Sequence, residues 1–521
     1  MLRISVFLFD TKLYAIVGLD RSRYYSEVKV AEEQQAKSVA AQVLDAAIVV
    51  FLFLFAISAP YSIAATQAAW LIGMLLWLMR FAFRPRLKLY KTPIDYFLLG
   101  FFILSGLSAL LSYEPMVSFG KLRAASLFTI VYLFAENVHS LRLVRLLALT
   151  LVGSCMINVF YTAGERLVGQ GVKVYGVSEN SPLYKVGVRD GDTLLQVDGA
   201  KLREPQDLLN SLSRADPQQA VVSVYRQELR FKLSVPRGSL LPGNNVLEQL
   251  GLQNWSRGRD WRAAGFYGHY ISYSEVLQLI IALTLGLFVS LPNKRSLATA
   301  LLLFALTGMC FALMLTVTRA SWLGCGVSSI IILLLAVQRR TMIIIGLLAM
   351  PLILAGLFVL QQKRNVGFLD QKDQSTTWRE TVWHEGVHLL ISNPRHLLIG
   401  VGMDSLKRHW REWGLFDGGR LPLGHMHSNL LQIALERGLP ALILWLAFLF
   451  VYARTLWRLL RRGEELQWIE RGVLLGALGG LAGFFTSGLV HYNWGDSEVV
   501  MVLYMIMGLC LAINRQLELT K

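Results

Sequence analysis

Charged side chains are scarce in this sequence, and their scarcity excludes an ordinary soluble protein. They make up 17% of the 521 residues, whereas a soluble chain carries about a quarter. Apolar residues take their place and gather in runs of about 17–23 residues, long enough to cross ~30 Å of hydrocarbon. We expect twelve membrane spans, near residues 44–60, 61–82, 94–112, 117–135, 142–163, 271–291, 296–317, 320–337, 341–360, 439–457, 471–489 and 498–513.

Cysteine is also rare. The four cysteines all fall inside expected spans, where cysteine usually acts as a small apolar residue; they are Cys155, Cys310, Cys325 and Cys510. Their spacing fits neither a disulfide framework nor a metal site. We expect no secretory leader, because the first apolar run, Ile4–Phe9, is short and ends at Asp10. Residues 1–43 are expected to be a cytoplasmic segment, to which we assign no function.

Acidic residues are outnumbered by basic ones, 35 to 51, which gives a formal net charge of +16. Such an excess would suit nucleic acid, but its placement argues against that partner. The basic residues crowd short connections that all fall on one side of the expected spans, as in cytoplasmic loops. These connections are Arg84–Lys88, Arg142–Arg145, Asn293–Arg295, Arg339–Arg340 and Arg458–Arg471. We therefore expect this side and both termini to be cytoplasmic, with membrane lipids and no nucleic acid as partners.

Two polar stretches, at about 165–270 and 361–438, interrupt the apolar runs, and counting spans places both on the non-cytoplasmic face. The expected fold is mainly α, a polytopic transmembrane helix bundle of about 12 spans with an inserted small α+β domain. We divide the chain into a cytoplasmic N-terminal segment (1–43), transmembrane helices 1–5 (44–163), the α+β domain (165–238), a connector (239–270), helices 6–9 (271–360), a large loop (361–438), helices 10–12 (439–513) and a cytoplasmic tail (514–521).

Strand patterns and turn signals fill the first polar stretch. Alternating runs at 172–177 and 192–197 precede a short helix at 205–212 and a hairpin of 220–225 with 228–235. The strings Glu179-Asn-Ser-Pro182, Val186-Gly-Val188, Gly191-Asp192 and Val197-Asp-Gly199 closely resemble bacterial PDZ domains over about 65 residues. That resemblance implies a peptide or protein ligand added to a sheet edge. The alternative is a domain that only packs against the membrane body or a second subunit.

Histidine is concentrated in the large loop. Six of the nine histidines lie there, namely His384, His388, His396, His409, His425 and His427. Imidazoles exchange protons near neutral pH, so we expect chemistry in this loop. His384 and His388 are i, i+4 on an expected helix, but the residues between them do not give the H-E-x-x-H order and no third ligand is evident. We therefore expect no metal and no cofactor.

Three ordered strings stand out in the second half of the chain. They are Thr316-Val-Thr-Arg-Ala-Ser-Trp322; Arg379-Glu-Thr-Val-Trp383 with Asn393-Pro394 and Gly400-Val-Gly402; and His425-Met-His-Ser-Asn-Leu-Leu431 with Glu436-Arg-Gly-Leu-Pro440. Together they resemble the O-antigen ligase and O-antigen polymerase superfamily over about residues 265–510. The chain departs from that family at Ser428, which stands directly after the histidine where the family has asparagine. The role of Asn429 is therefore open, although Ser428 can still donate a hydrogen bond.

The resemblance implies a metal-independent, inverting glycosyltransferase of the bacterial inner (cytoplasmic) membrane, with the PDZ-like domain and large loop in the periplasm. It would move a glycan from undecaprenyl diphosphate to an acceptor hydroxyl, the lipid A–core sugar in ligases. His427 would be the general base, placed at a helix N-terminus because 428–437 forms an amphipathic segment closed by Gly438. His425 is the weaker candidate, since residues two apart do not share a helical face.

Fixed positive charge is the other need of such a reaction, because a guanidinium makes bidentate contacts to phosphate oxygens. Arg319, at the outer end of a span, and Arg379 would hold the departing diphosphate. The alternatives are a snorkelling anchor for Arg319, a solvated loop residue for Arg379, and a local packing role for His427.

Lys121 and Arg123 point to the same site without help from the family. Only 12 residues separate Arg123 from Glu136, too few to span, so the fourth span must carry both cations within its outer turns. Intramembrane charges are functional candidates by default. The two lie about 200° apart around a helix, so we expect one of them to hold the diphosphate, unless both snorkel to the interface.

Three other functions compete with a ligase. A polysaccharide polymerase and a transferase that glycosylates protein belong to the same superfamily, and the PDZ-like domain could recruit a polypeptide acceptor. The non-enzymatic alternative is a transporter or a membrane scaffold. A transporter would show polar, broken helices near the bilayer midplane in two related halves, and the sequence has no such repeat.

Overall fold

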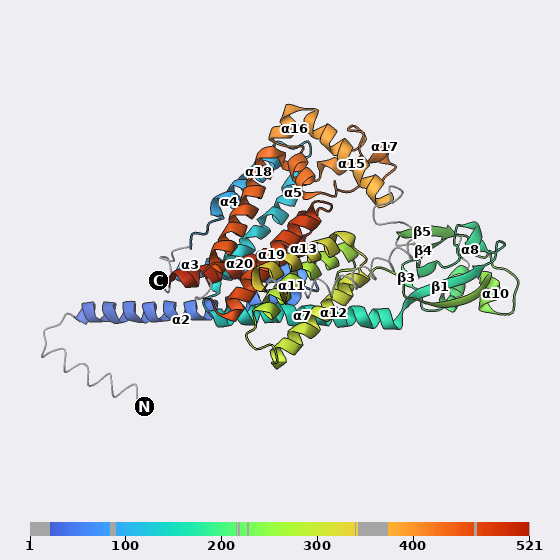
Figure 1. The fold of residues 1–521 in the computed structure, drawn as a ribbon. Helices are drawn as coiled ribbons and strands as arrows, with labels where there is room; N and C mark the ends of the chain where they lie inside the picture. Colours follow the sequence, from blue (N-terminus) through green and yellow to red (C-terminus); the bar gives the residue numbers. More distant parts are fainter. Residues whose placement is uncertain are drawn as a thin grey trace.

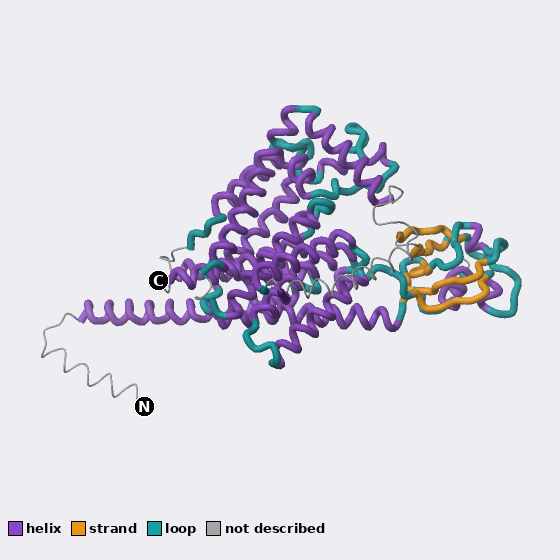
Figure 2. The backbone as a smooth tube through the Cα atoms, in the orientation of Figure 1, coloured by secondary structure: helices purple, strands orange, loops and turns teal. Residues whose placement is uncertain are grey.

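The computed structural model describes residues 21–83, 90–214, 216, 219–226, 229–338, 340–341, 374–462 and 466–519. Within these residues the chain is mainly helical, and one small sheet domain lies beyond the end of a long helix (Figure 1, Figure 2). The mainly α fold with an inserted α+β domain is therefore confirmed.

Ten helices among the described residues are long and apolar enough to cross a membrane. They are α2 (Arg21–Ser58, apolar from Val39), α3 (Ile63–Phe83), the broken helix α5–η1–α6 (Pro115–Ala125, Ser126–Phe128, Thr129–Asn137), α7 (Leu141–Val168), α11 (Tyr270–Ser290), α12 (Leu297–Leu315), α13 (Arg319–Ala336), α18 (Asn429–Leu460), α19 (Trp468–Gly488) and α20 (Ser497–Leu519). A shorter apolar helix, α4 (Asp95–Leu110), coincides with the third expected span. The expected span at 341–360 lies outside the described residues.

Helices α11 and α20 form the centre of the bundle, with 83% and 94% of their apolar windows buried. Helix α19 packs on α11 with unusually close backbones, because glycines meet at the contact. A Cβ atom on Gly286 of α11 would lie 2.3 Å from the Gly472 carbonyl oxygen of α19. Small residues allow this approach where lipid gives no hydrophobic drive for helix association.

Helix α18 begins ten residues before the span expected at 439–457. Its first segment, residues 429–437, ends at Gly438, whose φ of 82° and ψ of 166° are not helical. A Cβ atom there would lie 2.4 Å from the Leu398 carbonyl oxygen, so the site requires glycine. Pro440 then stands near the start of the membrane-crossing segment.

The large loop folds over the end of the bundle where α18 begins (Figure 1). It contains α15 (Gln374–Ile391), α16 (Pro394–Leu398), η3 (Ser405–Lys407) and α17 (Phe416–Gly419). Backbone hydrogen bonds from Val401 N to Leu435 O (2.7 Å) and from Gly402 N to Glu436 O (3.1 Å) tie it to α18. These bonds fix the loop relative to the helix that follows the histidine pair.

The sheet domain is antiparallel, with strand order β5-β4-β2-β1-β6 and β3 beside β2. Its strands are β1 (Gln170–Val177), β2 (Thr193–Val197), β3 (Ala200–Lys201), β4 (Ala220–Arg226), β5 (Leu229–Val235) and β6 (Leu252–Gly258), and its helices are α8 (Pro182–Lys185), α9 (Pro205–Leu212) and α10 (Val246–Leu250). Helix α7 leads directly into β1. The strands and the helix expected from the sequence all form.

The boundary that we expect at residue 238 falls inside the sheet. Strand β6 lies in the expected connector and pairs with β1 from Gln170–Gly258 to Val177–Leu252. The residues of β6 are mostly polar and only two are buried, so the alternation that marks the other strands is missing. The connector is therefore part of the domain.

Candidate active site

Three histidines from two distant parts of the chain meet next to the first turn of α18. His425 and His427 precede that helix, and His491 lies between α19 and α20. The ring centroids are 4.3 Å apart for His425–His427, 5.3 Å for His425–His491 and 6.0 Å for His427–His491. The argument that residues two apart do not share a helical face does not apply to His425 and His427, because this segment is not helical and the two rings lie side by side.

His427 has a strained backbone, with a φ of 47°. A non-glycine residue in this region costs on the order of 1–3 kcal/mol and persists only where its surroundings fix it. Its neighbour Met426 is held twice, by Trp383 Nε1 donating to its carbonyl (2.8 Å) and by its N–H donating to Gln432 Oε1 (2.7 Å). The ring of Trp378 packs edge-on against the imidazole of His427 at 4.7 Å. The position of His427 is therefore set by α15 and α18 together.

Burial keeps the histidine pair neutral. Burial, with the nearby charges of His491 and Arg379, lowers the pKa of His427 to about 3. Burial, followed by the charges of His427 and His491, lowers the pKa of His425 to about 2. Both rings therefore have a free nitrogen lone pair at neutral pH, as a general base needs.

A buried carboxylate, Glu275 of α11, lies behind His491. Its Oε1 is 3.0 Å from His491 Nδ1, and the two side chains are 1% and 5% exposed. Burial would lower the pKa of His491, but Glu275 outweighs it and the pKa is raised. Burial, followed by the charge of Glu275, raises the pKa of nearby Asp496 to about 7. These groups form a titratable cluster that extends from the histidine pair into the bundle.

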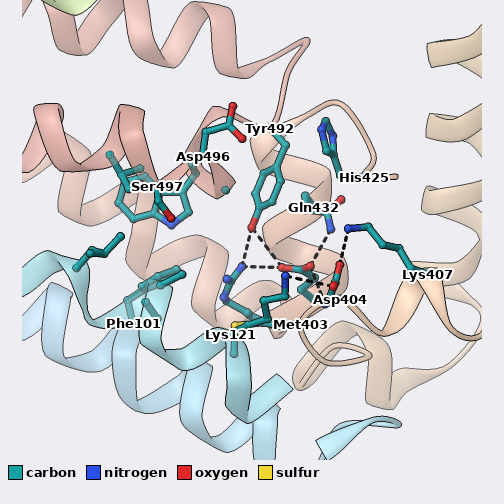
Figure 3. A pocket seen from close by; sticks show the side chains of 18 of the residues that line it. Phe101, Lys121, Met403, Asp404, Lys407, His425, Gln432, Tyr492, Asp496 and Ser497 are labelled. Carbon is teal, nitrogen blue, oxygen red and sulfur yellow. Dashed lines mark hydrogen bonds and ion pairs between the residues drawn. The ribbon is translucent and has the colours of Figure 1, made fainter. Parts of the chain in front are cut away.

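A cavity of about 220 Å³ opens beside this cluster (Figure 3). Lys121 of α5 and Lys407 of η3 approach it from different elements and both pair with Asp404, at 3.3 and 2.8 Å. Burial would raise the pKa of Asp404, but Lys407 and Lys121 outweigh it and lower the pKa. A second cavity of about 450 Å³ shares Lys121 and is lined also by Arg123. The two cavities therefore adjoin each other at the positively charged side chain of Lys121.

The buried carboxylate of Glu436 holds the wall of the smaller cavity together. Its Oε1 accepts from Gln432 Nε2 (2.8 Å) and from the Asp404 N–H (3.0 Å). Its Oε2 accepts from Tyr492 Oη (3.3 Å) and pairs with Arg437 (3.0 Å). Figure 3 shows these contacts converging below Tyr492. The sequence marks Glu436 only as part of a string, and its role as an organiser was missed.

The four predicted cations are at different places. Arg379 is on α15, a half-buried helix position and not a loop, and its charge acts on both His427 and His491. Arg319 is the first residue of α13; two residues on, Ser321 Oγ lies 2.8 Å from Ser274 Oγ, next to Glu275. Lys121 lines both cavities and Arg123 only the larger one.

Ser428 and Asn429 have structural contacts. Ser428 is the N-cap of α18 and accepts from the Leu431 N–H at 3.5 Å. Asn429 is buried; its Nδ2 donates to Asn493 Oδ1 (2.6 Å), and its Oδ1 accepts from the Trp494 N–H (3.1 Å). Asn429 thus ties α18 to the segment that carries His491.

His384 and His388 are exposed on α15 and belong to neither of the two groups of potential metal ligands among the described residues. The groups that do form, His425 with His427 and His491, and Glu275 with His491 and Asp496, depend on residues to which the sequence analysis assigned no role. One signal existed: Glu275 is an acidic residue inside an apolar run, and such residues mark functional sites.

The comparison with known proteins covers part of this site. Residues 300–446, which include Arg319, Arg379 and both histidines of the pair, match the O-antigen ligase family, and residues 149–236 match the PDZ domain. A protein of Rickettsia conorii described as a polysaccharide ligase is 26% identical over 244 residues, 44% of this chain. The chain spans 55% of the length of that relative.

The molecule is therefore a multi-pass membrane protein with a segment similar to the O-antigen ligase family. More particularly, its second half matches the O-antigen ligase family at residues 300–446, and the inserted sheet domain matches the PDZ domain, as the sequence motifs predict.

Proposed function

We propose that the protein moves a glycan from undecaprenyl diphosphate to an acceptor hydroxyl, the sugar of lipid A–core, at the periplasmic face of a bacterial inner membrane. The observation that carries the proposal is the neutral, half-buried His427, which is held at a strained backbone, feels the charge of Arg379, and neighbours His425 at the wall of a cationic cavity. A base, a cation and a lipid-level hollow are what this transfer needs.

In this mechanism the acceptor hydroxyl gives its proton to a ring nitrogen of His427. The acceptor oxygen then forms a bond to the anomeric carbon, and the bond from that carbon to the diphosphate oxygen breaks with inversion. The leaving electron pair stays on undecaprenyl diphosphate. Arg319 and Arg379 stabilise the negative charge that develops there, and no metal takes part in any step.

Lys121 is the better of the two candidates for the lipid diphosphate on α5. It lines both cavities, whereas Arg123 lines only the larger one. The larger cavity also includes Trp70 and Met116, and Met116 is 85% exposed in the described chain. An exposed apolar rim suits the prenyl chain, so the diphosphate would lie at Lys121 with the lipid leaving past Met116.

The test is conversion of undecaprenyl-diphosphate-linked glycan into acceptor-linked glycan by the purified protein. His427→Ala should lower the rate by roughly 10²–10⁴ while the protein stays in the membrane, because it removes the general base. His384→Ala, at an exposed histidine of the same loop, is the matched control and should leave the rate nearly unchanged. Near-normal turnover by His427→Ala would rule out the mechanism.

The PDZ domain favours one variation, in which the acceptor is carried by a polypeptide. PDZ domains bind peptides at a sheet edge, and β6 and β5 are the edges of this sheet. If deletion of the sheet domain leaves the glycan products unchanged, the polypeptide acceptor is excluded and the domain only packs.

A further inference from the structure

The three imidazoles of the site can bind one ion together. One ring nitrogen each of His425, His427 and His491 lies within 4.8 Å of the others. A tetrahedral Zn²⁺ holds imidazole nitrogens at about 2.0–2.1 Å, which places them about 3.4 Å from each other. Rotation of the side chains by about an ångström at the ring is enough to reach that distance. Neutral imidazole is a preferred ligand of Zn²⁺, Cu²⁺ and Ni²⁺.

The backbone holds the three histidines in this arrangement. His425 and His427 flank Met426, whose carbonyl and N–H are both fixed by side chains of α15 and α18. The positive φ of His427 brings its ring back toward His425. The segment that carries His491 is held to the same helix by Asn429. The three ligands are therefore placed by the fold and not by flexible chain ends.

A carboxylate supports the third ligand in the way that metal sites usually require. Histidines that bind metals commonly interact through their other ring nitrogen with a carboxylate, which fixes the ring and raises its basicity. Glu275 takes this place, 3.0 Å from His491 Nδ1, which leaves Nε2 for an ion. Asp496 lies within the same reach of Glu275 and His491.

Unsatisfied polar atoms gather at this point. His427 Nδ1 and both oxygens of Glu275 are buried and make no hydrogen bond within the described residues. Such atoms are rare in folded proteins, and each one calls for an explanation such as an ion. Glu275 Oε1 and His491 Nδ1 nevertheless lie 3.0 Å apart. A divalent cation next to the three imidazoles would compensate the buried carboxylate.

We propose that His425, His427 and His491 bind one divalent transition-metal ion, with Zn²⁺ the best fit, and that the bound ion switches the transfer reaction off. The ion would occupy the lone pair with which His427 accepts the proton of the acceptor. The binding half of the proposal is independent of the reaction, whereas the inhibitory half rests on the proposed function.

Binding is tested on the full-length protein in detergent by titration with Zn²⁺ alone, and with Co²⁺, whose visible absorption reports tetrahedral nitrogen ligands. The wild type and His388→Gln, an exposed histidine of α15, should bind one ion with the same affinity. His491→Gln and His425→Gln should bind at least 100-fold more weakly, and Zn²⁺ should raise the Tm of the wild type but not of these variants. Equal affinity in all four proteins would overturn the site, and His425→Gln decides the question if His491→Gln does not fold.

Measurements of turnover separate the binding of the ion from its inhibition of the reaction. Zn²⁺ at the concentration that fills the site should stop turnover, and a chelator should restore it. The chelator alone should leave the rate unchanged. If the site binds Zn²⁺ and turnover persists, inhibition is refuted while the site stands. If the chelator alone abolishes turnover, the ion takes part in the reaction, and both the inhibitory role and the metal-free mechanism are wrong.

Discussion

Two equally buried carboxylates show how differently the two regions of this molecule are built. Asp192 in the sheet domain and Glu275 in the bundle are each 1% exposed. Asp192 accepts from Arg226 Nε and a second guanidinium nitrogen, both at 2.6 Å, and from the Arg189 N–H at 2.8 Å. Glu275 lies against His491 and accepts no hydrogen bond within the described residues.

The difference separates a structural charge from a functional one. Removing one partner of a matched buried charge pair is costly, because it leaves the other charge uncompensated. A buried charge that accepts no hydrogen bond costs stability and persists where it shifts the pKa of a neighbour or binds a ligand. Asp192 closes the sheet between β2 and β4, whereas Glu275 raises the pKa of His491 next to the histidine pair. The site is thus the region where a buried carboxylate has fewer hydrogen bonds than in the sheet domain.

The contrast between the two regions would fail most clearly if the histidine site of the helix bundle carried out no chemistry. Arg379→Ala and Arg319→Ala should each lower turnover about 10²–10³-fold, since each strips charge stabilisation from the leaving diphosphate. Lysine at either position should restore only part of the rate, because an ammonium lacks the bidentate fork. The glycan-transfer assay on purified protein measures this. Arg226→Ala in the sheet domain is the control and should retain the wild-type rate, whereas equal losses in all three would show a general folding defect.

The stability of the sheet domain should depend on whether its sheet is complete. A fragment of residues 165–262, which contains β6, should unfold cooperatively in urea, and a fragment of residues 165–238 should not. Without β6 the edge of β1 loses a partner along its whole length, and the core loses the contacts of Leu250 and Leu252. Circular dichroism at increasing urea compares the two. A shorter fragment as stable as the longer one would return the domain boundary to residue 238.

Local pattern explains what could be predicted from the sequence. Spans, strands β1, β2, β4 and β5, and helix α9 each follow from hydrophobic runs or alternation within one segment, and the PDZ and ligase strings are contiguous. The site depends on tertiary pairing instead. His491 reaches His425 across α18 and α19, and β6 pairs with a strand some 80 residues earlier. Neither pairing leaves a periodic mark, so neither could be derived from spacing.

The helical geometry that we expected from the sequence at the histidine pair is also wrong. A helical 100° per residue separates positions two apart, but His427 has a φ of 47° and Ser428 is the N-cap of α18. A positive φ at a histidine cannot be predicted from composition, and its neighbour Met426 is held by hydrogen bonds to the side chains of Trp383 and Gln432. The helix start was predicted, and the turn before it was not.

Replacing each carboxylate by its amide tests the comparison directly. Asp192→Asn should lower the free energy of unfolding of the 165–262 fragment by about 1.5–3 kcal/mol, the value of hydrogen bonds to a charged group. Turnover of the full-length protein should not change, because this residue lies in the sheet domain. Urea denaturation of the fragment and the transfer assay measure the two effects. An unchanged midpoint would mean that Arg226, which is partly exposed, keeps its hydration and that the pair is dispensable.

Glu275→Gln should have the smaller effect on stability, and it should change the pH dependence of turnover. Burial lowers the pKa of His491 and Glu275 raises it, so without the carboxylate His491 loses its proton at a lower pH. A neutral His491 no longer depresses the pKa of His427, which is now about 3, and that pKa rises. His427 acts as a base only when neutral, so the acid limb of kcat/KM should move to higher pH, while the rate at pH 7 falls by less than about tenfold. Thermal stability should be unchanged or slightly lower, because His491 loses its ion-pair partner. A pH–rate profile of wild type and Glu275→Gln measures the shift, with Asp192→Asn as the control. An acid limb that stays in place would show that Glu275 and His491 do not act on His427.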